Sequence, residues 1–193
     1  SIEAAAPFMF VHLSNRRGGL YGAGMRQELT ITRVGAQGDG VAETSKRPVF
    51  AALTLPGERI EAAIVDGRAE DVRLVAPSDE RIAPVSAHYG DCGGCSLQHW
   101  ASAPYLAWKR EQVRLALARE GIETEIEPTV ATPPGSRRRL ALHARRGPGG
   151  RAILGFKARR SWRLVEVTEC PVADPRIVRA FPLLADVAAP FLE

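Results

Sequence analysis

The stretch that decides the fold of the first half of the chain is Ile60-Glu61-Ala62-Ala63-Ile64-Val65-Asp66-Gly67-Arg68-Ala69-Glu70-Asp71-Val72-Arg73-Leu74. From Ile60 to Ile64, every second residue is apolar, which predicts a strand with one buried face. The pair Asp66-Gly67 favours a two-residue hairpin turn, and Val72 and Leu74 repeat the apolar alternation after it. We therefore predict an antiparallel hairpin whose two strands share one apolar face.

The residues before this hairpin have the same character. Leu29 and Ile31 alternate with polar residues, a glycine-rich turn follows at 35–40, and a second apolar run begins at Val49. Another turn, Leu55-Pro56-Gly57-Glu58, leads into the hairpin, and no helical period occurs between 27 and 75. About five short strands of this kind suit a small closed β-barrel of the OB type.

The second half of the chain predicts a mixed α and β unit. Residues 76–84 resemble a linker, and a helix is expected from Ser102 until Gly121 stops it. Three strands are predicted at 140–144, 152–157 and 162–167, the first two separated by a glycine-rich turn. Asp174-Pro175 should cap a final helical segment that Pro182 interrupts.

The distribution of charge says more than its total. Lys and Arg number 26 against 22 Asp and Glu, a net charge of +4 with a sequence pI near 9.3. No acidic residue occurs between Glu127 and Glu166, although that window is rich in arginine. A polyanion is the partner that such a window favours.

The most informative motif for chemistry is Tyr89-Gly90-Asp91-Cys92-Gly93-Gly94-Cys95-Ser96-Leu97-Gln98-His99. Two thiolates separated by two glycines can meet one metal, and Cys170, followed by Pro171, offers a distant third ligand. The alternative is that Cys170 is a small apolar core residue and that the pair is a reduced hairpin. Three cysteines, two of them in this motif, argue against a secreted disulfide scaffold and favour metal or redox chemistry.

Taken together, these motifs closely resemble the bacterial family of S-adenosylmethionine-dependent RNA (uracil-5-)-methyltransferases, from Met25 to the end of the chain. The resemblance rests on the glycine-rich turn within Ile31–Gly40, the Leu55–Glu58 turn, the cysteine motif, the arginine triplet 137–139, Gly155-Phe156-Lys157, and Glu169-Cys170-Pro171. It implies an OB-like TRAM domain at 25–78 and an α+β central domain of the iron–sulfur type at 85–193. Residues 1–24 are expected to be an upstream extension or a remnant of cloning.

The resemblance implies metal ligands at Cys92, Cys95 and Cys170, matching a [4Fe–4S] cluster in the ribosomal-RNA branch of the family. The family pattern has its first cluster cysteine where this chain has Ser86, and a serine oxygen is a hard, poor ligand for cluster iron. The alternatives are therefore a cluster held by three cysteines and another ligand, a zinc site completed by His88 or His99, and an empty site. An engineered change of cysteine to serine would also explain Ser86.

The predicted RNA-binding residues combine cations with one aromatic ring. A tryptophan among arginines suits stacking on an unpaired base while the cations neutralise phosphates. A solvated face with Trp162 in the core is the alternative. By strand parity, Arg137 and Arg139 should share the face of His143. The residues predicted to bind RNA are Lys109, Arg110, Arg137, Arg139, Lys157, Arg159, Arg160 and Trp162.

The predicted function is substrate recognition without the chemistry of methyl transfer. Family members use a cysteine nucleophile, a base and an adenosyl-binding loop, and none of these is recognised in this sequence. We therefore expect the methyltransferase domain, which binds S-adenosylmethionine, to be absent. We assign no catalytic residue. RNA is the expected partner, ribosomal rather than transfer RNA, for a monomeric cytoplasmic protein without a membrane segment. A stand-alone RNA-binding module and a metal or redox sensor are the alternatives.

Overall fold

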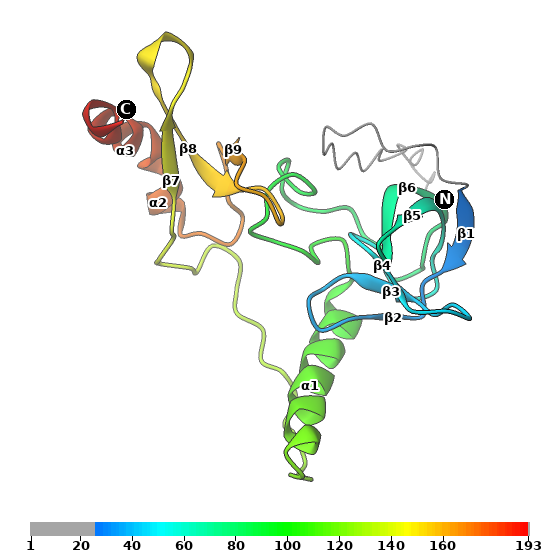
Figure 1. Cartoon of the computed structure of the whole chain (residues 1–193). Helices are drawn as coiled ribbons and strands as arrows, with labels where there is room; N and C mark the ends of the chain where they lie inside the picture. The colour runs from blue at the N-terminus through cyan, green and yellow to red at the C-terminus, as the bar shows by residue number, and fades with distance from the viewer. Residues whose placement is uncertain (1–25, 193) are drawn as a thin grey trace, which may run out of the picture. The chain divides into compact units, whose positions relative to one another are not determined.

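The chain, described here from a computed structural model at residues 26–192, divides between Arg81 and Ile82 into two compact units (Figure 1). The predicted upstream extension, residues 1–24, lies outside the described residues. Within the described part, no helix is both long enough and apolar enough to cross a membrane.

The first unit is built from one six-stranded sheet in the order β1-β5-β6-β4-β3-β2. The central hairpin pairs β5 with β6, and the turn between them places Asp66 and Gly67 at φ values of 49° and 76°. Two successive residues in the left-handed region define the turn that Asp-Gly favours, so the predicted hairpin is confirmed. The strands are β1 (Gln27–Thr30), β2 (Arg33–Val34), β3 (Gly40–Ala42), β4 (Val49–Ala51), β5 (Arg59–Val65) and β6 (Arg68–Ala76).

The sheet curls because its two edge strands are consecutive in the sequence. β1 pairs with β5 and β2 pairs with β3, yet only Ile31 and Thr32 separate β1 from β2. The Ile31 N–H donates to Glu58 O and the Thr32 N–H donates to Val41 O, each at 2.8 Å. The result is a barrel-like sheet, as predicted, with six strands instead of about five; β3 begins at Gly40, the last residue of the expected glycine turn.

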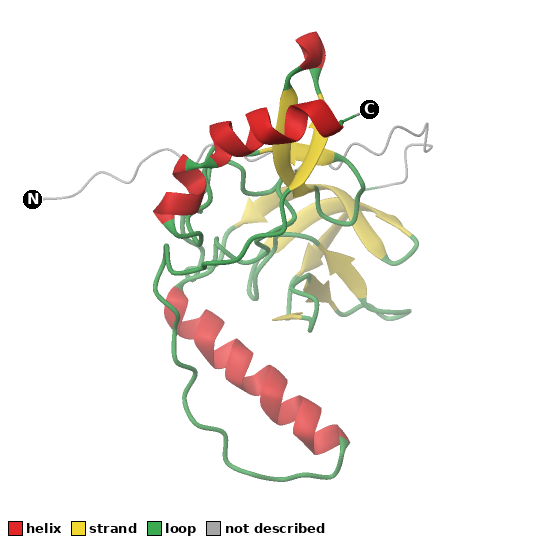
Figure 2. Ribbon diagram, turned by 90° about the vertical axis from the view of Figure 1, so that its left-hand side faces the viewer, coloured by secondary structure: helices red, strands yellow, loops and turns green. Residues whose placement is uncertain are grey.

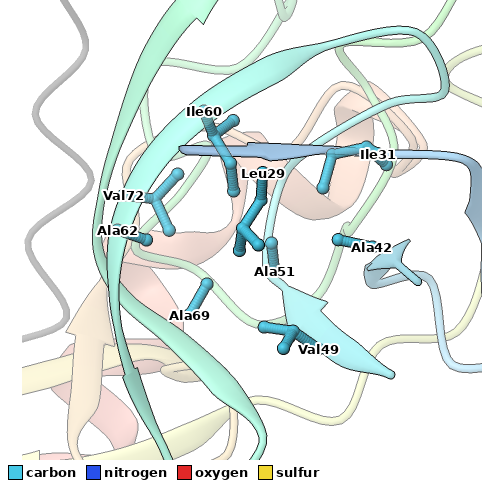
Figure 3. Packing of buried hydrophobic residues seen from close by; sticks show 9 residues of the cluster. All are labelled: Leu29, Ile31, Ala42, Val49, Ala51, Ile60, Ala62, Ala69 and Val72. Atoms are coloured by element: carbon cyan, nitrogen blue, oxygen red, sulfur yellow. The ribbon is translucent and has the colours of Figure 1, made fainter. Parts of the chain in front are cut away.

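The core of this unit lies inside the curl, where nine buried side chains from five strands and the β1–β2 junction meet (Figure 3). They include the inward-facing residues of the predicted hairpin, Ile60, Ala62 and Val72. Gly40 is required at its position because a Cβ there would lie 2.1 Å from Thr54 Oγ1. The core cluster is Leu29, Ile31, Ala42, Val49, Ala51, Ile60, Ala62, Ala69 and Val72.

The second unit combines a long helix, a three-stranded antiparallel sheet and two short helices. After α1 the chain runs back beside the helix as an irregular segment (Figures 1 and 2), where Thr129 Oγ1 donates to Leu106 O at 3.1 Å. α3 packs on β8, and Phe181 joins Val165 and Val167 in the core. The elements are α1 (Ser102–Arg119), β7 (His143–Arg146), β8 (Ala152–Lys157), β9 (Leu164–Glu166), α2 (Pro175–Arg179) and α3 (Phe181–Ala188), with 3-10 turns at Pro148–Gly150 and Ala189–Phe191.

Predicted strand limits in this unit are partly wrong. β8 has the predicted bounds, whereas β7 begins at His143 instead of residue 140 and β9 spans 164–166 instead of 162–167. The Arg137 backbone is already engaged, because its N–H donates to Val172 O at 3.0 Å and its carbonyl accepts from the Asp174 N–H at 2.9 Å. The expected strand parity of Arg137, Arg139 and His143 therefore does not apply.

The two remaining differences concern Trp162 and the last helices. The Ala158 N–H donates to Arg163 O at 2.8 Å, which closes a loop that contains Trp162 and excludes it from β9. The C-terminal helix is capped by Asp174, as predicted, since its carboxylate accepts from the Arg176 N–H at 2.9 Å. The helical segment is interrupted at Ala180, between α2 and α3, and not at Pro182. Pro182 lies in the first turn of α3, where a missing N–H costs nothing.

Candidate functional site

All three cysteines of the second unit line one cavity, which we call the thiol cavity. Cys92 and Cys95 come from the loop before α1, and Cys170 comes from the segment after β9. Ser86 lines the same cavity, so the residue at the family's first ligand position lies with the three thiols. The structure therefore brings together the predicted cysteines from segments that are far apart in the sequence.

The cysteine loop is held against the end of β8. The Gly93 N–H donates to Lys157 O at 3.0 Å, and Cys92 and Ala158 form an isolated antiparallel bridge. A Cβ on Gly93 would lie 2.7 Å from Lys157 O and 2.9 Å from Arg159 N, so only glycine permits this approach. The glycine after Cys92 thus has a structural reason, close contact with a neighbouring backbone.

The residues just before the cysteine motif are tied to the segment that carries Cys170. Glu169 accepts a hydrogen bond from the Ala87 N–H at 2.6 Å, and His88 Nε2 accepts one from the Thr168 N–H at 3.1 Å. Nε2 of His88 is therefore already engaged by Thr168. His99, the other histidine of the predicted zinc alternative, is fully buried beside the Tyr89 hydroxyl and does not line the cavity.

The thiols influence one another. Burial raises the pKa of Cys92, the Gly94 N–H opposes this by donating to its sulfur, and the nearby Cys95, Cys170 and Asp91 raise the pKa further. In kind, three sulfur donors around one cavity fit a thiophilic metal or cluster, whereas the Ser86 hydroxyl does not supply a fourth soft ligand. As the side chains stand, no group of three or more His, Cys, Asp or Glu residues within the described chain is arranged to hold an ion.

Next to the thiol cavity lies a basic loop, defined here as residues 157–163. Trp162 is 86% exposed, and Lys157 Nζ lies 3.5 Å from the centroid of its ring. The alternative that placed Trp162 in the core is therefore wrong. Arg163 forms an ion pair with Asp91, the residue before Cys92, and this pair links the basic loop to the cysteine loop.

The other predicted RNA-binding residues are distributed over three places. Arg137 lines the thiol cavity, and Arg139 is exposed on the following segment. Lys109 and Arg110 lie on α1 and line no part of the thiol cavity. Lys109 Nζ lies 5.2 Å from the Tyr105 ring centroid, and Arg110 lines a groove of about 730 Å³ between α1 and residues 124–129.

Some arginines of the acid-free window are neutralised from outside it. Arg151 forms a two-bonded pair with Glu166, with a shortest N–O distance of 2.6 Å, and Arg163 pairs with Asp91. The predictions missed these ties and the contact of Arg137 with the thiol cavity. The one sequence signal for the Arg163 pair was Asp91, an acid of the cysteine motif that lies outside the window.

Comparison with known proteins gives relatives of one kind. The chain is 62% identical over 169 residues to an uncharacterized RNA methyltransferase of Caulobacter vibrioides. The alignment covers 86% of this chain and 41% of the relative. It is 39% identical over 160 residues to the 23S rRNA (uracil(1939)-C(5))-methyltransferase of Halomonas elongata, covering 79% of this chain and 33% of that protein. No protein-family model matches the chain.

A solved structure shares the fold. The Pyrococcus abyssi tRNA (uracil-54, C5)-methyltransferase, in complex with S-adenosyl-L-homocysteine, matches 85% of this chain and 36% of its own with a TM-score of 0.57 at 24% identity. Both sequence relatives are named as RNA methyltransferases, and the solved structure shows the same fold. The chain belongs to the RNA (uracil-5-)-methyltransferase family, whose N-terminal part it matches, and it spans about two-fifths of the length of its Caulobacter relative. The predicted family resemblance is confirmed.

Proposed function

We propose that this chain is the RNA-binding, substrate-recognition part of an S-adenosylmethionine-dependent RNA uridine-5-methyltransferase. The observation that carries the proposal is the basic loop, in which an exposed tryptophan and Lys157 lie directly beside the cysteine loop. Relatives named as uracil-C5 methyltransferases of ribosomal RNA support the substrate class. The first unit would be the TRAM domain (25–78), and the second would be the central domain (85–193).

The work of these residues in such a reaction is binding and orientation. Cations neutralise RNA phosphates, and the Gly93 to Lys157 hydrogen bond of 3.0 Å fixes the start of the loop that carries them. S-adenosylmethionine, which supplies the methyl group in this family, and the catalytic residues would belong to the remaining part of the protein. We assign no catalytic residue within this chain.

We further infer that the thiol cavity binds a metal centre through Cys92, Cys95 and Cys170. Such a centre would join the loop before α1 to the segment after β9 and so stabilise the second unit. Anaerobically purified protein with an iron–sulfur cluster is brown and contains iron and sulfide, whereas a zinc site gives a colourless protein with stoichiometric zinc. Protein without either metal after reconstitution would refute the inference.

RNA binding is tested by removing cations whose charge should contact phosphate. A triple variant with Arg137, Arg139 and Lys157 changed to Ala should weaken the binding of a single-stranded RNA and flatten its salt dependence. Each lost phosphate contact lowers the slope of log K against log salt concentration by about 0.7. The slope should therefore fall by roughly 2 in the triple variant if all three residues contact phosphate.

A matched control separates specific contact from net charge. Arg114, Arg151 and Arg176 lie in the same unit but pair with Glu111, Glu166 and Asp174, each with an N–O distance of 2.6 Å. Their triple replacement by Ala removes the same charge, yet it should change the salt slope by much less. Equal slopes in the two triple variants would contradict RNA contact at the proposed residues.

Methyl transfer is tested with the protein at the full length of its relatives. Transfer of a labelled methyl group to uridine C5 is expected, with ribosomal RNA transcripts preferred over transfer RNA. Tight RNA binding without any methyl transfer to either transcript would instead support a stand-alone RNA-binding module.

A further inference from the structure

Trp162 has no role in the packing of its own unit. Its side chain is 86% exposed, and it is not among the residues that form or pack against the core of the second unit. The loop that carries it is nevertheless well defined, because the Ala158 N–H donates to Arg163 O at 2.8 Å and the Ser161 N–H donates to Ala158 O at 3.1 Å. A large aromatic ring is thus displayed in solvent by an ordered turn.

The ring is oriented by a cation on one of its faces. Lys157 Nζ lies 3.5 Å from the ring centroid, well within the range of a cation–π interaction. Lys157 is itself fixed at the end of β8, where it pairs with Leu164 and its carbonyl accepts the Gly93 N–H at 3.0 Å. With one face covered by the ammonium group, the high exposure of the residue leaves the opposite face accessible to a planar ligand.

We propose that Trp162 is a stacking platform for an unpaired RNA base, with Lys157 and the neighbouring arginines binding the flanking phosphates. This inference rests on the proposed function and deepens it by naming the class of RNA. An unpaired base exposes its π-face, whereas the bases of a duplex are already stacked on their neighbours. Every base has such a face, so the platform should tolerate different sequences.

The composition of the basic loop favours nucleic acid over a protein partner. Four of its seven residues are Lys or Arg and none is acidic, and of these cations Arg163 pairs with Asp91 of the cysteine loop. An apolar protein surface would suit the indole ring but not this density of positive charge. A single-stranded RNA supplies both the planar ring and the anionic backbone that the loop requires.

The inference is tested with the 193-residue chain and two probes of equal phosphate number, a single-stranded oligouridylate and a blunt RNA duplex. Trp162→Ala should weaken oligouridylate binding by about 5- to 100-fold, the range typical for loss of one stacked base. The salt slope should stay unchanged because no charge is lost, and duplex binding should change little. Trp162→Phe should retain most of the affinity, and Val130→Ala, at another highly exposed apolar residue (90%), should have no effect.

Fluorescence supplies an independent readout. Trp100 is 6% exposed and Trp108 stacks on Tyr105 with centroids 6.2 Å apart, so Trp162 is the indole best placed to stack on a ligand. Oligouridylate should quench the emission of the wild-type chain, and Trp162→Phe should abolish that quenching while Trp108→Phe retains it.

The outcomes separate this inference from the proposed function. If the wild-type chain binds neither probe, the proposed function fails, and the platform fails with it. If it binds oligouridylate but Trp162→Ala neither weakens binding nor removes quenching, RNA recognition stands and the platform is overturned, leaving Trp162 as a protein-contact residue. Equal weakening of duplex and single-strand binding would overturn the assignment to an unpaired base.

Discussion

Breaking the buried ion pair between Glu58 and Arg81 should destabilise the first unit. The Glu58 carboxylate is fully buried and accepts from the Leu55 N–H at 2.8 Å and from the Arg81 guanidinium at 2.5 and 2.9 Å. Arg81 also donates to Leu53 O at 2.8 Å. The pair therefore fastens the end of the unit to the turn that precedes β5.

Arg81→Ala should destabilise this unit strongly because it leaves a buried carboxylate without its counter-charge. Removing one partner of a buried pair costs about 3–5 kcal/mol, and the 19% exposure of the Arg81 side chain places the expected cost near the lower limit, about 3 kcal/mol. Arg59→Ala is the matched control in the same sheet. Its pair with Glu28 is about half exposed on both sides, so its loss should cost less than about 1 kcal/mol.

Hydrogen exchange is the suitable assay, since the tryptophans at 100, 108 and 162 all belong to the second unit and cannot report on the first. Amides of β5 and β6 should exchange roughly 100-fold faster in Arg81→Ala, as about 3 kcal/mol implies. A double variant, Glu58→Gln with Arg81→Met, should recover much of the loss because no unpaired charge remains. If Arg81→Ala exchanges no faster than Arg59→Ala, the pair does not stabilise the fold.

Three further predictions concern the second unit. Gly93→Ala should separate the cysteine loop from β8, because its Cβ would lie 2.7 Å from Lys157 O. We expect metal analysis to show lower metal retention and a binding titration to show weaker RNA binding. Unchanged values in both assays would contradict the packing of the cysteine loop against β8. Ser86→Cys should increase the iron bound after anaerobic reconstitution and the visible absorbance, since it adds a fourth thiol at the cavity; unchanged iron content would argue against a cluster there. Asp174 has a pKa lowered to about 2 by its hydrogen bonds with Arg176, so its stabilising contribution should be complete above pH 3.8 and be lost as the pH falls toward 2; Asp174→Asn should lack this acid dependence in thermal unfolding.

Local signals in the sequence predicted the elements that local interactions determine. A two-residue hairpin turn of this type requires two left-handed residues, which Asp-Gly adopts readily, and the structure has φ values of 49° and 76° at Asp66 and Gly67. The bounds of β8 and the end of α1 before Gly121 were likewise predictable from alternation and from a helix-stopping glycine. Each of these features depends on residues that are close together in the chain.

The features that could not be predicted depend on distant partners. Arg137–Arg139 looked like the start of a strand, but the Arg137 backbone pairs with the segment at 172–174, which no local pattern reveals. The burial of Glu58 was equally hidden, since an acid in a Pro-Gly turn is normally exposed, and the counter-charge that makes its burial tolerable comes from the distant Arg81. For the candidate site, the sequence indicated that the three cysteines belong together, but not that their loop lies against the loop of Trp162.

That contact changes how the two parts of the proposed site should be regarded. Gly93 donates to Lys157 O, Cys92 bridges Ala158, and Asp91 pairs with Arg163, so each of these residues of the cysteine loop contacts the basic loop. Any ligand that orders the thiols therefore also restricts the backbone from which Trp162 projects. Because linkage between binding equilibria is reciprocal, a metal that tightens RNA binding must itself be held more tightly when RNA is bound. If the chain binds RNA as proposed, the cysteines would contribute to recognition through the backbone of the basic loop without touching RNA.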